Sequence, residues 1–123
     1  MAAAEFLQAI TLDPERLDAR HNLALALLRL DRPGEAEEHL RENLDLDPRF
    51  APSHVLLGKI LQNTARLEDA ERQLLSAVEA DERSAEAHRA LAALFAATDR
   101  PERAAESARR AEELTRSSTE NAG

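Results

Sequence analysis

Histidines and carboxylates are the side chains of this 123-residue chain most suited to chemistry, because it contains no cysteine. His54 and His88 stand 34 residues apart, and His21 and His39 complete a set of four. Imidazole is a common zinc ligand, but a zinc site needs three or four ligands at short range. No nearby His, Asp or Glu completes such a set around His54 and His88. We therefore predict no metal site and no cofactor, and interpret His54 and His88 as polar edge residues and His21 and His39 as surface residues.

No pattern typical of catalysis accompanies the carboxylates. The chain has three glycines, too few for a phosphate-binding loop, and neither a G-x-S-x-G elbow nor an H-E-x-x-H pair. Many acids have the spacing of helix-surface ion pairs, as in Glu37 with Arg41 and Glu68 with Arg72. No nucleophile, base and stabilising group can be combined into one constellation, so we predict that the protein is not an enzyme.

The charge and hydropathy of the chain limit the classes of partner that it can bind. A formal net charge of −8 opposes binding to nucleic acid and to anionic membranes. No apolar run approaches the roughly 18 residues needed to span a bilayer, and the N-terminus lacks the basic region of a secretory signal. We expect a cytoplasmic protein. Lys59 is the only lysine among 16 basic residues, a bias typical of GC-rich genomes, so we expect a bacterial source.

The elements that must position any site repeat every 34 residues. Leu23, Leu57 and Leu91 are equivalent at this step. The same step relates further positions: Ala2, Ala36, Ala70 and Ala104; Phe6, Leu40, Leu74 and Ala108; Ala24, Gly58 and Ala92; Leu27, Leu61 and Phe95; Asp13, Asp47 and Asp81. No insertion interrupts this register, which predicts a repeat architecture.

Each unit contains two apolar stripes at helical spacing. In one unit they are Leu23, Ala24, Leu27 and Leu28, then Ala36, Leu40 and Leu44. The stripes are separated by Asp31-Arg32-Pro33-Gly34, and a similar break recurs at residues 99–102; we expect the Asp to cap the second helix and the Pro to lie in its first turn. The second helix should end at Asp47-Pro48, since a residue before Pro avoids the α region. We predict an all-α fold.

Three features resemble the tetratricopeptide repeat family. These are the pairs Leu23-Ala24, Leu57-Gly58 and Leu91-Ala92; the small residues Ala36, Ala70 and Ala104; and the endings Leu12-Asp13-Pro14 and Leu46-Asp47-Pro48. The chain departs from the family pattern at four kinds of position. The family's usual aromatic residue is replaced by Arg20, His54 and His88, and its later Tyr by Leu27, Leu61 and Phe95; Glu82 replaces a closing Pro, and Asn43 replaces a small apolar residue. We expect these departures to soften the packing.

The resemblance implies an α-solenoid of about three and a half antiparallel helix-turn-helix units. We expect a second helix alone at residues 2–13, then hairpins at residues 17–48, 51–82 and 85–115. The domain would cover residues 1–116, and the Ser/Thr-rich residues 117–123 would form a disordered tail.

In this family the first helices of successive hairpins line a concave groove that binds peptides. The resemblance places these residues in that groove: His21, Asn22, Leu25, Leu28, Val55, Lys59, Gln62, Arg89 and Ala93. An apolar floor flanked by His21, Lys59 and Arg89 would suit a protein segment with an acidic group, although these positions would also suit an ordinary solvated face. Asn22 matches one position of the family's carboxylate clamp, but Pro52 and Leu56 stand where basic residues are expected, so the clamp is not supported.

The two ends of the solenoid differ. Glu112 and Ala108 occupy positions that are large and apolar in earlier units, which indicates a polar cap. Phe6, Leu7 and Ile10 at the other end either pack on the next hairpin, as in a fragment, or form an association surface for a second copy or a partner helix. The favoured function is an adaptor or scaffold that binds a protein segment. The alternative is a structural subunit of a larger complex, or a homodimer, assembled through this helix or through the acidic face at residues 35–47.

Overall fold

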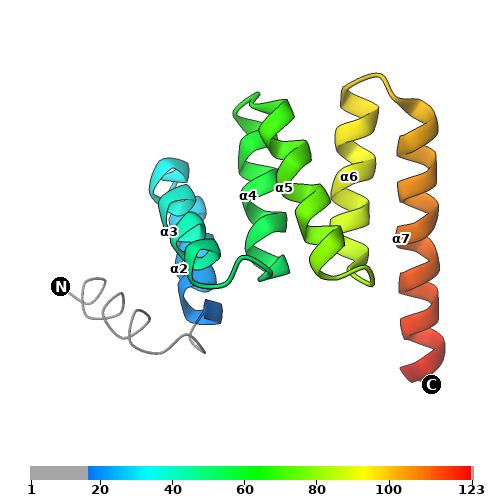
Figure 1. The fold of residues 1–123 in the computed structure, drawn as a ribbon, viewed down its shortest axis with the longest axis horizontal. Coiled ribbons are helices and arrows are strands. Elements are labelled where there is room, and N and C mark those ends of the chain that lie inside the picture. The colour runs from blue at the N-terminus through cyan, green and yellow to red at the C-terminus, as the bar shows by residue number, and fades with distance from the viewer. Residues whose placement is uncertain (1–16, 123) are drawn as a thin grey trace.

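The computed structural model describes residues 17–122, with side chains as far as Ser117, and these residues form an all-α solenoid (Figure 1). Its helices are α2 (Leu17–Arg29), α3 (Pro33–Leu46), α4 (Ala51–Asn63), α5 (Leu67–Ala80), α6 (Ala85–Ala97) and α7 (Pro101–Ala122). Three antiparallel hairpins therefore follow one another along the chain, as the 34-residue repeat predicts. The helix expected at residues 2–13, with Phe6, Leu7 and Ile10, lies outside the described residues.

The turn inside each hairpin is made by one residue in the left-handed region. Asp31, Ala65 and Asp99 have φ of 59°, 62° and 56°, and they are equivalent in the three hairpins. The prediction that Asp31 caps the next helix is therefore wrong. The residue at the start of α3 is Arg32, and no side chain caps it, because Asp31 is used to reverse the chain direction one residue earlier. Pro33 does lie in the first turn of α3.

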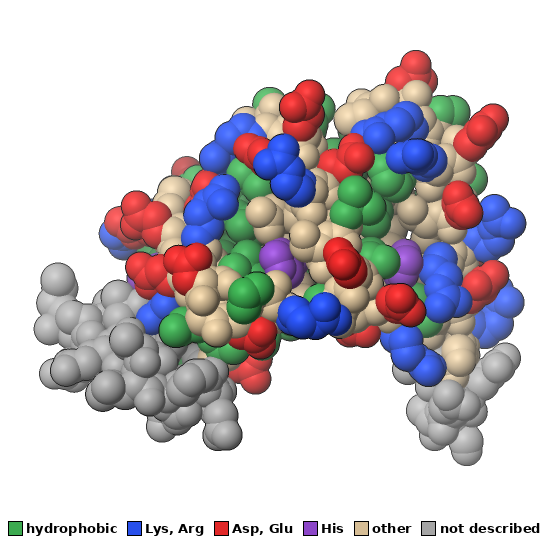
Figure 2. All heavy atoms as spheres, viewed as in Figure 1, with side chains coloured by type: hydrophobic (Ala, Val, Ile, Leu, Met, Phe, Trp, Pro, Cys, Tyr) green, Lys and Arg blue, Asp and Glu red, His purple; other side chains and the backbone are tan. Residues whose placement is uncertain are grey.

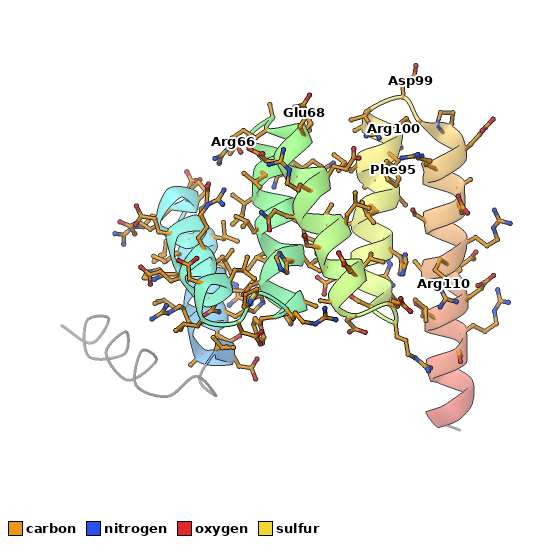
Figure 3. The ribbon with its side chains drawn as sticks, viewed as in Figure 1. Arg66, Glu68, Phe95, Asp99, Arg100 and Arg110 are labelled. Atoms are coloured by element: carbon orange, nitrogen blue, oxygen red, sulfur yellow. The ribbon has the colours of Figure 1, made fainter. Side chains whose placement is uncertain are left out.

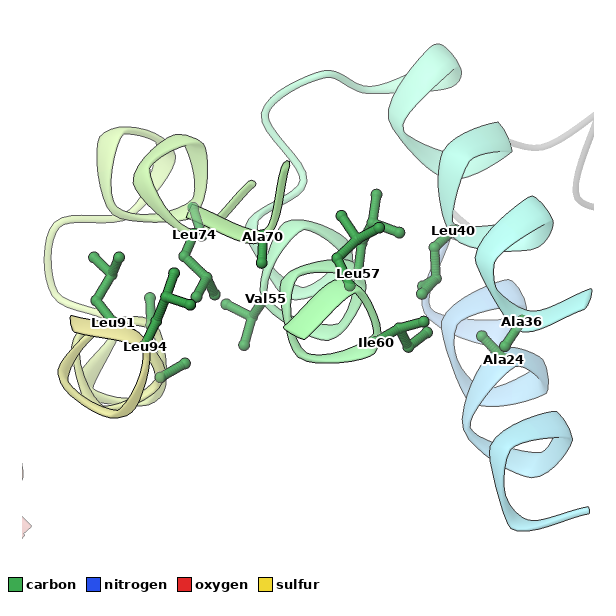
Figure 4. Packing of buried hydrophobic residues seen from close by; sticks show 14 of the residues in the cluster. Ala24, Ala36, Leu40, Val55, Leu57, Ile60, Ala70, Leu74, Leu91 and Leu94 are labelled. Atoms are coloured by element: carbon green, nitrogen blue, oxygen red, sulfur yellow. The ribbon is translucent and has the colours of Figure 1, made fainter. Parts of the chain in front are cut away.

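The core runs through all three hairpins and consists almost entirely of leucine and alanine. Leu40, Leu57, Leu61, Leu74 and Leu94 have no exposed surface, and Ala24, Ala36 and Ala70 let neighbouring helices approach (Figure 4). Burying a leucine side chain contributes about 1.5–3 kcal/mol relative to leaving it in water. Because each helix presents its apolar stripe to a neighbour, the hairpins are stable only as a stack.

The helices form an inner and an outer row. Within the inner row α4 and α6 contact each other, whereas direct contact between α2 and α4, between α3 and α5, and between α5 and α7 is slight or absent. The first helices of the hairpins, α2, α4 and α6, therefore lie on the inside of the curve, and the second helices are spread apart on the outside.

The last helix is longer than the repeat requires. Its backbone continues to Ala122, so residues 117–122, for which the sequence predicts a disordered tail, are helical in the structure. A helix that has already formed adds one hydrogen bond for each residue it orders, which allows α7 to continue past the last packed turn. None of the described helices is both long and apolar enough to cross a bilayer.

Candidate functional site

The inner row of helices carries the residues that the sequence places in a groove. Eight of the nine are accessible at least in part: His21, Asn22, Leu25, Leu28, Lys59, Gln62, Arg89 and Ala93. The ninth, Val55, is 4% exposed and belongs to the core, so its placement in the groove is wrong. Val55 is buried because α4 packs against three other helices, α3, α5 and α6.

A hollow of about 460 Å³ opens where the ends of α2 and α4 meet. Leu28 and Leu56 are half-buried in its walls and Ile60 is buried beneath them. Its rim carries Lys59, Asn63, Thr64, Asp31 and Pro33. A mostly apolar recess with a few polar groups at its edge is the usual form of a site for a side chain of a bound partner.

The charges on the inner face are arranged differently from the prediction. Lys59 Nζ lies 2.7 Å from Glu86 Oε1, an ion pair that joins α4 to α6. The sequence did not predict this pair, and an acidic partner would have to compete with Glu86 for Lys59. An exposed pair of this kind contributes little stability. It does fix a neutral patch at the middle of the inner face.

His21 also fails to supply a positive charge. It is half-buried with its ring edge toward Phe50, at 6.3 Å between centroids, so it is not simply a surface residue. Burial lowers the pKa of His21, although the carboxylates of Glu86 and Asp18 oppose this shift. Since the ordinary pKa is about 6.5, His21 is mostly neutral at pH 7. The inner face near α2 therefore combines the half-buried Leu25 and Leu28 with the exposed carboxylate of Asp18, and is not basic.

Arg89 lies at the α6 end of the inner face and remains exposed. Its Nη2 donates a hydrogen bond to Thr115 Oγ1 at 3.3 Å. It also borders a second hollow of about 410 Å³, formed with α7 residues that include Ala108 and Glu112. Ala108 and Glu112 are exposed there, as expected for a polar cap.

The two equivalent histidines hold the loops between hairpins. His54 is buried, so its interpretation as an edge residue is wrong, and its Nε2 lies 2.7 Å from the carbonyl oxygen of Pro48. His88 Nε2 makes the same contact with the carbonyl of Glu82 at 3.1 Å. Because a carbonyl can only accept, Nε2 donates in both rings. Within residues 17–117 no group of three metal-binding side chains is placed to hold an ion.

The sequence reasoning missed a ladder of ion pairs along the outer edge. Arg66 binds Glu37 of the preceding hairpin, and Arg100 binds Glu71 in the same way. These hydrogen bonds lower the pKa of Glu37 and of Glu71, chiefly through the arginine and against a smaller opposing effect of burial. The signal was present, since both the arginines and the glutamates are 34 residues apart.

The acidic face at residues 35–47 is largely neutralised within the molecule. Glu35 pairs with Arg32, Glu37 with Arg41 and Arg66, and Glu42 with Arg20, while Asp47 accepts from the backbone N–H of Arg49. Figure 2 shows the resulting mixture of acidic and basic side chains on this side of the molecule. Such a mixed surface has little net field to attract a basic partner.

Known proteins with the same repeat fold were found by comparison of the sequence and the structure. Residues 2–116 match the family model of the cilia and flagella-associated protein 70 middle TPR-like domain. The chain belongs to this family of tetratricopeptide-repeat-like domains. A search of curated proteins finds no match.

Solved structures of similar fold include PilF of Pseudomonas aeruginosa, with 26% identity and a TM-score of 0.79; the match covers 94% of this chain and 53% of PilF. A crystal structure of MamA has 15% identity and a TM-score of 0.80, with 94% and 67% covered. The second TPR of Spaghetti (RPAP3), bound to the HSP90 peptide SRMEEVD, has 12% identity and a TM-score of 0.77, with 84% and 95% covered. The chain thus spans about two thirds of the MamA chain and half of PilF.

Proposed function

We propose that this chain is a non-enzymatic adaptor that binds a segment of a partner protein along the inner face formed by α2, α4 and α6. The observation that carries the proposal is the apolar hollow between Leu28 and Leu56. It receives a large apolar side chain of the segment, and the neighbouring pair of Lys59 and Glu86 offers both a donor and an acceptor to its backbone.

The family supports this function in a general way. Tetratricopeptide-like solenoids commonly mediate interactions between proteins, and the RPAP3 repeat was solved with a peptide bound. The surface here differs in chemistry from a face built to hold an acidic terminus. Because Lys59 is paired and the pKa of His21 is lowered, the segment is expected to bind mainly through apolar contacts.

The second candidate is a structural subunit or homodimer. It would rest on Phe6, Leu7 and Ile10, which lie outside the described residues, or on the acidic face of α3, whose carboxylates are mostly paired. Affinity separates the two functions, because an adaptor binds a short segment reversibly, whereas a subunit needs a large interface and copurifies with its complex. A bacterial source and a cytoplasmic location remain part of the proposal, with no nucleic-acid or membrane partner.

Site-specific crosslinking tests the adaptor function. A photo-reactive amino acid replaces exposed Asn63 at the rim of the inner hollow, and in a second protein it replaces exposed Arg72 on α5. The expected result is a crosslink to a defined partner segment from residue 63 and not from residue 72. Equal crosslinking from both positions would contradict binding on the inner face.

Two neighbouring leucines then provide a matched pair of variants. Leu28→Glu places a charge in the hollow, whereas Leu30→Glu changes a leucine that is 65% exposed and lies outside it. A synthetic peptide of the crosslinked segment should bind Leu28→Glu at least about tenfold more weakly than the unchanged chain, a loss of about 1.4 kcal/mol. Leu30→Glu should bind normally. Arg89→Glu, on α6, should also weaken binding, with little change in the midpoint of thermal unfolding. If the affinity of this variant is unchanged, α6 does not contribute to the binding site, which is then confined to α2 and α4.

A further inference from the structure

The outer face has a hollow of its own, over α6 and between α5 and α7. Its volume is about 530 Å³, and eight residues from the three helices line it. The spread of the outer helices creates the space, because α5 and α7 are scarcely in contact. Figure 2, which looks onto this side, shows hydrophobic side chains deep between the two helices and basic ones along the rim. None of the residues that form this hollow belongs to the inner face.

The floor and one wall of this outer hollow are apolar. Leu91 and Phe95 of α6 form the floor and are 3% and 5% exposed. Leu75 of α5 forms a wall and is 47% exposed, although it is a large hydrophobic residue. The equivalent of Leu75 in the preceding hairpin is Arg41, so the repeat does not require a leucine here.

A change of side-chain length opens the hollow. In the preceding hairpin, Gln73 reaches across and lies 2.8 Å from Nδ1 of His54. The equivalent residue in the last hairpin is Ser107, whose side chain is too short to reach His88. Nε2 of His88 is already bonded to the Glu82 carbonyl, and in this part of the structure its Nδ1 has no partner. The hollow is therefore lined by an imidazole nitrogen and a hydroxyl that a ligand can reach.

Two arginines of α7 lie on the rim. Arg103 and Arg110 stand where the preceding hairpin has Asp69 and Ser76, and Glu106, which also lines the hollow, stands where that hairpin has Arg72. The guanidinium of Arg103 lies 5.9 Å from the centre of the Phe95 ring, and among the described side chains no carboxylate is within ion-pair distance of it. Arg110 forms an exposed ion pair with Glu113 at 3.6 Å, which a carboxylate of a partner has to replace. Figure 3 shows Phe95 near the start of α7 and Arg110 further along the same helix. With Glu106 counted, the lining carries a net charge of +1 in a chain of net charge −8.

We propose that this outer hollow is a second binding site, which takes an acidic segment of a partner protein that carries a large apolar side chain. The apolar side chain lies against Leu75 and the α6 floor, and the flanking carboxylates meet Arg103 and Arg110. Arginine suits this role because its planar guanidinium binds a carboxylate through two hydrogen bonds. Nucleic acid is a poor occupant, since the net negative charge repels a phosphate backbone, which also offers no aliphatic side chain.

Peptide binding to the full chain tests the proposal. The probe is a fluorescein-labelled peptide of repeated Glu-Glu-Leu, and its two controls replace every Leu by Ser or every Glu by Lys. Fluorescence anisotropy is measured up to about 1 mM protein, because a contact of this size gives weak affinity. We expect binding of the Glu-Glu-Leu peptide only. Absence of binding, or equal binding of the lysine peptide, would overturn the proposal.

Variants then locate the binding on the outer face. Arg103→Glu combined with Arg110→Glu should weaken the Glu-Glu-Leu peptide at least about tenfold. Leu75→Ala should weaken it by a smaller factor. Arg72→Glu is the matched control, because Arg72 is the exposed arginine on α5 that pairs with Asp69 outside the hollow, and it should have no effect.

Leu28→Glu separates this proposal from the inner-face function, since it blocks only the inner hollow. The acidic peptide should bind Leu28→Glu normally. If Leu28→Glu abolishes its binding and the double arginine variant does not, the peptide binds the inner face and the second site is refuted. Circular dichroism of each variant checks that the helices remain folded.

Discussion

Arg66 and Glu37 form a two-point ion pair across the boundary between successive hairpins. Arg66 Nη2 donates to Glu37 Oε1 at 2.6 Å and Nη1 donates to Oε2 at 3.1 Å. Nε of the same guanidinium donates to Thr64 Oγ1 at 3.1 Å, which holds it in position. Arg100, Glu71 and Thr98 repeat this arrangement one unit later. The ladder therefore joins successive hairpins along the edge of the stack where the left-handed turns lie.

This ladder predicts an acid-sensitive part of the stability. Because the folded pKa of Glu37 and of Glu71 is lowered, the stabilisation is complete above the ordinary carboxyl pKa of about 4.3 and is lost as the pH falls through the folded values. Glu37→Gln combined with Glu71→Gln should lower the urea midpoint at about pH 7, and the difference from the unchanged chain should shrink as the pH falls below the ordinary carboxyl pKa and through the folded values. Glu38→Gln, an exposed neighbour, should match the unchanged chain throughout. A difference that persists in acid would mean that the carboxylate charge is not responsible.

Ala65 offers a direct test of the turn geometry. It has φ of 62° and lacks the short polar side chain that lets Asp31 and Asp99 adopt this region more easily. Ala65→Gly should raise the free energy of unfolding by about 0.5–1 kcal/mol, because relief of strain outweighs the added freedom of the unfolded chain. Ala26→Gly in the exposed middle of α2 should lower it by about 1 kcal/mol. Equal destabilisation by both changes, measured by urea denaturation, would show that the turn is not left-handed at Ala65.

The repeat and the helical stripes were sufficient to predict the fold. Leu57 is fully buried and the three hairpins begin where the 34-residue step places them, since both features depend on local spacing. Val55 was misplaced because burial at one repeat position depends on neighbours. The equivalent residue is half-buried in α2 as His21 and exposed in α6 as Arg89, while α4 packs against α3, α5 and α6.

The site was predicted less well than the fold, and for a physical reason. Lys59 and Glu86 are 27 residues apart, and only the packing of α4 against α6 brings them together. The conformation of the turn at Asp31 was also inaccessible, because Asp is common both as a helix cap and in the left-handed region.

Asn43 was expected to soften the packing, yet it connects three elements. Its amide nitrogen donates to the Leu17 carbonyl at 2.9 Å and to Ser53 Oγ at 3.2 Å, and the side chain is fully buried. Asn43→Ala should lower the free energy of unfolding by about 1–2 kcal/mol, because it removes hydrogen bonds and leaves the Ser53 hydroxyl buried without this partner.

A double-mutant cycle checks the coupling of Asn43 to Ser53. Asn43→Ala with Ser53→Ala reproduces the pair Ala77 and Ala87, which occupies the same positions in the next hairpin. The double variant should be more stable than the sum of the two single losses by about 0.5–1 kcal/mol. Strictly additive losses in urea denaturation would show that the two side chains do not interact.

Gly58 marks the closest approach of α4 and α5. A Cβ placed on it would lie 2.7 Å from Cγ and Cδ2 of Leu74, well inside van der Waals contact. Alanine favours a helix over glycine by about 1 kcal/mol, but overpacking a core costs about 1–3 kcal/mol, so Gly58→Ala should destabilise the chain. Gly34→Ala is the matched control, since a Cβ there meets nothing within 4 Å, and it should stabilise α3 by up to about 1 kcal/mol. Thermal unfolding of the two variants should shift in opposite directions. If Gly58→Ala also raised the midpoint, α4 and α5 would have to be able to move apart without loss of packing, and the glycine at this position would then be unnecessary for the hairpin.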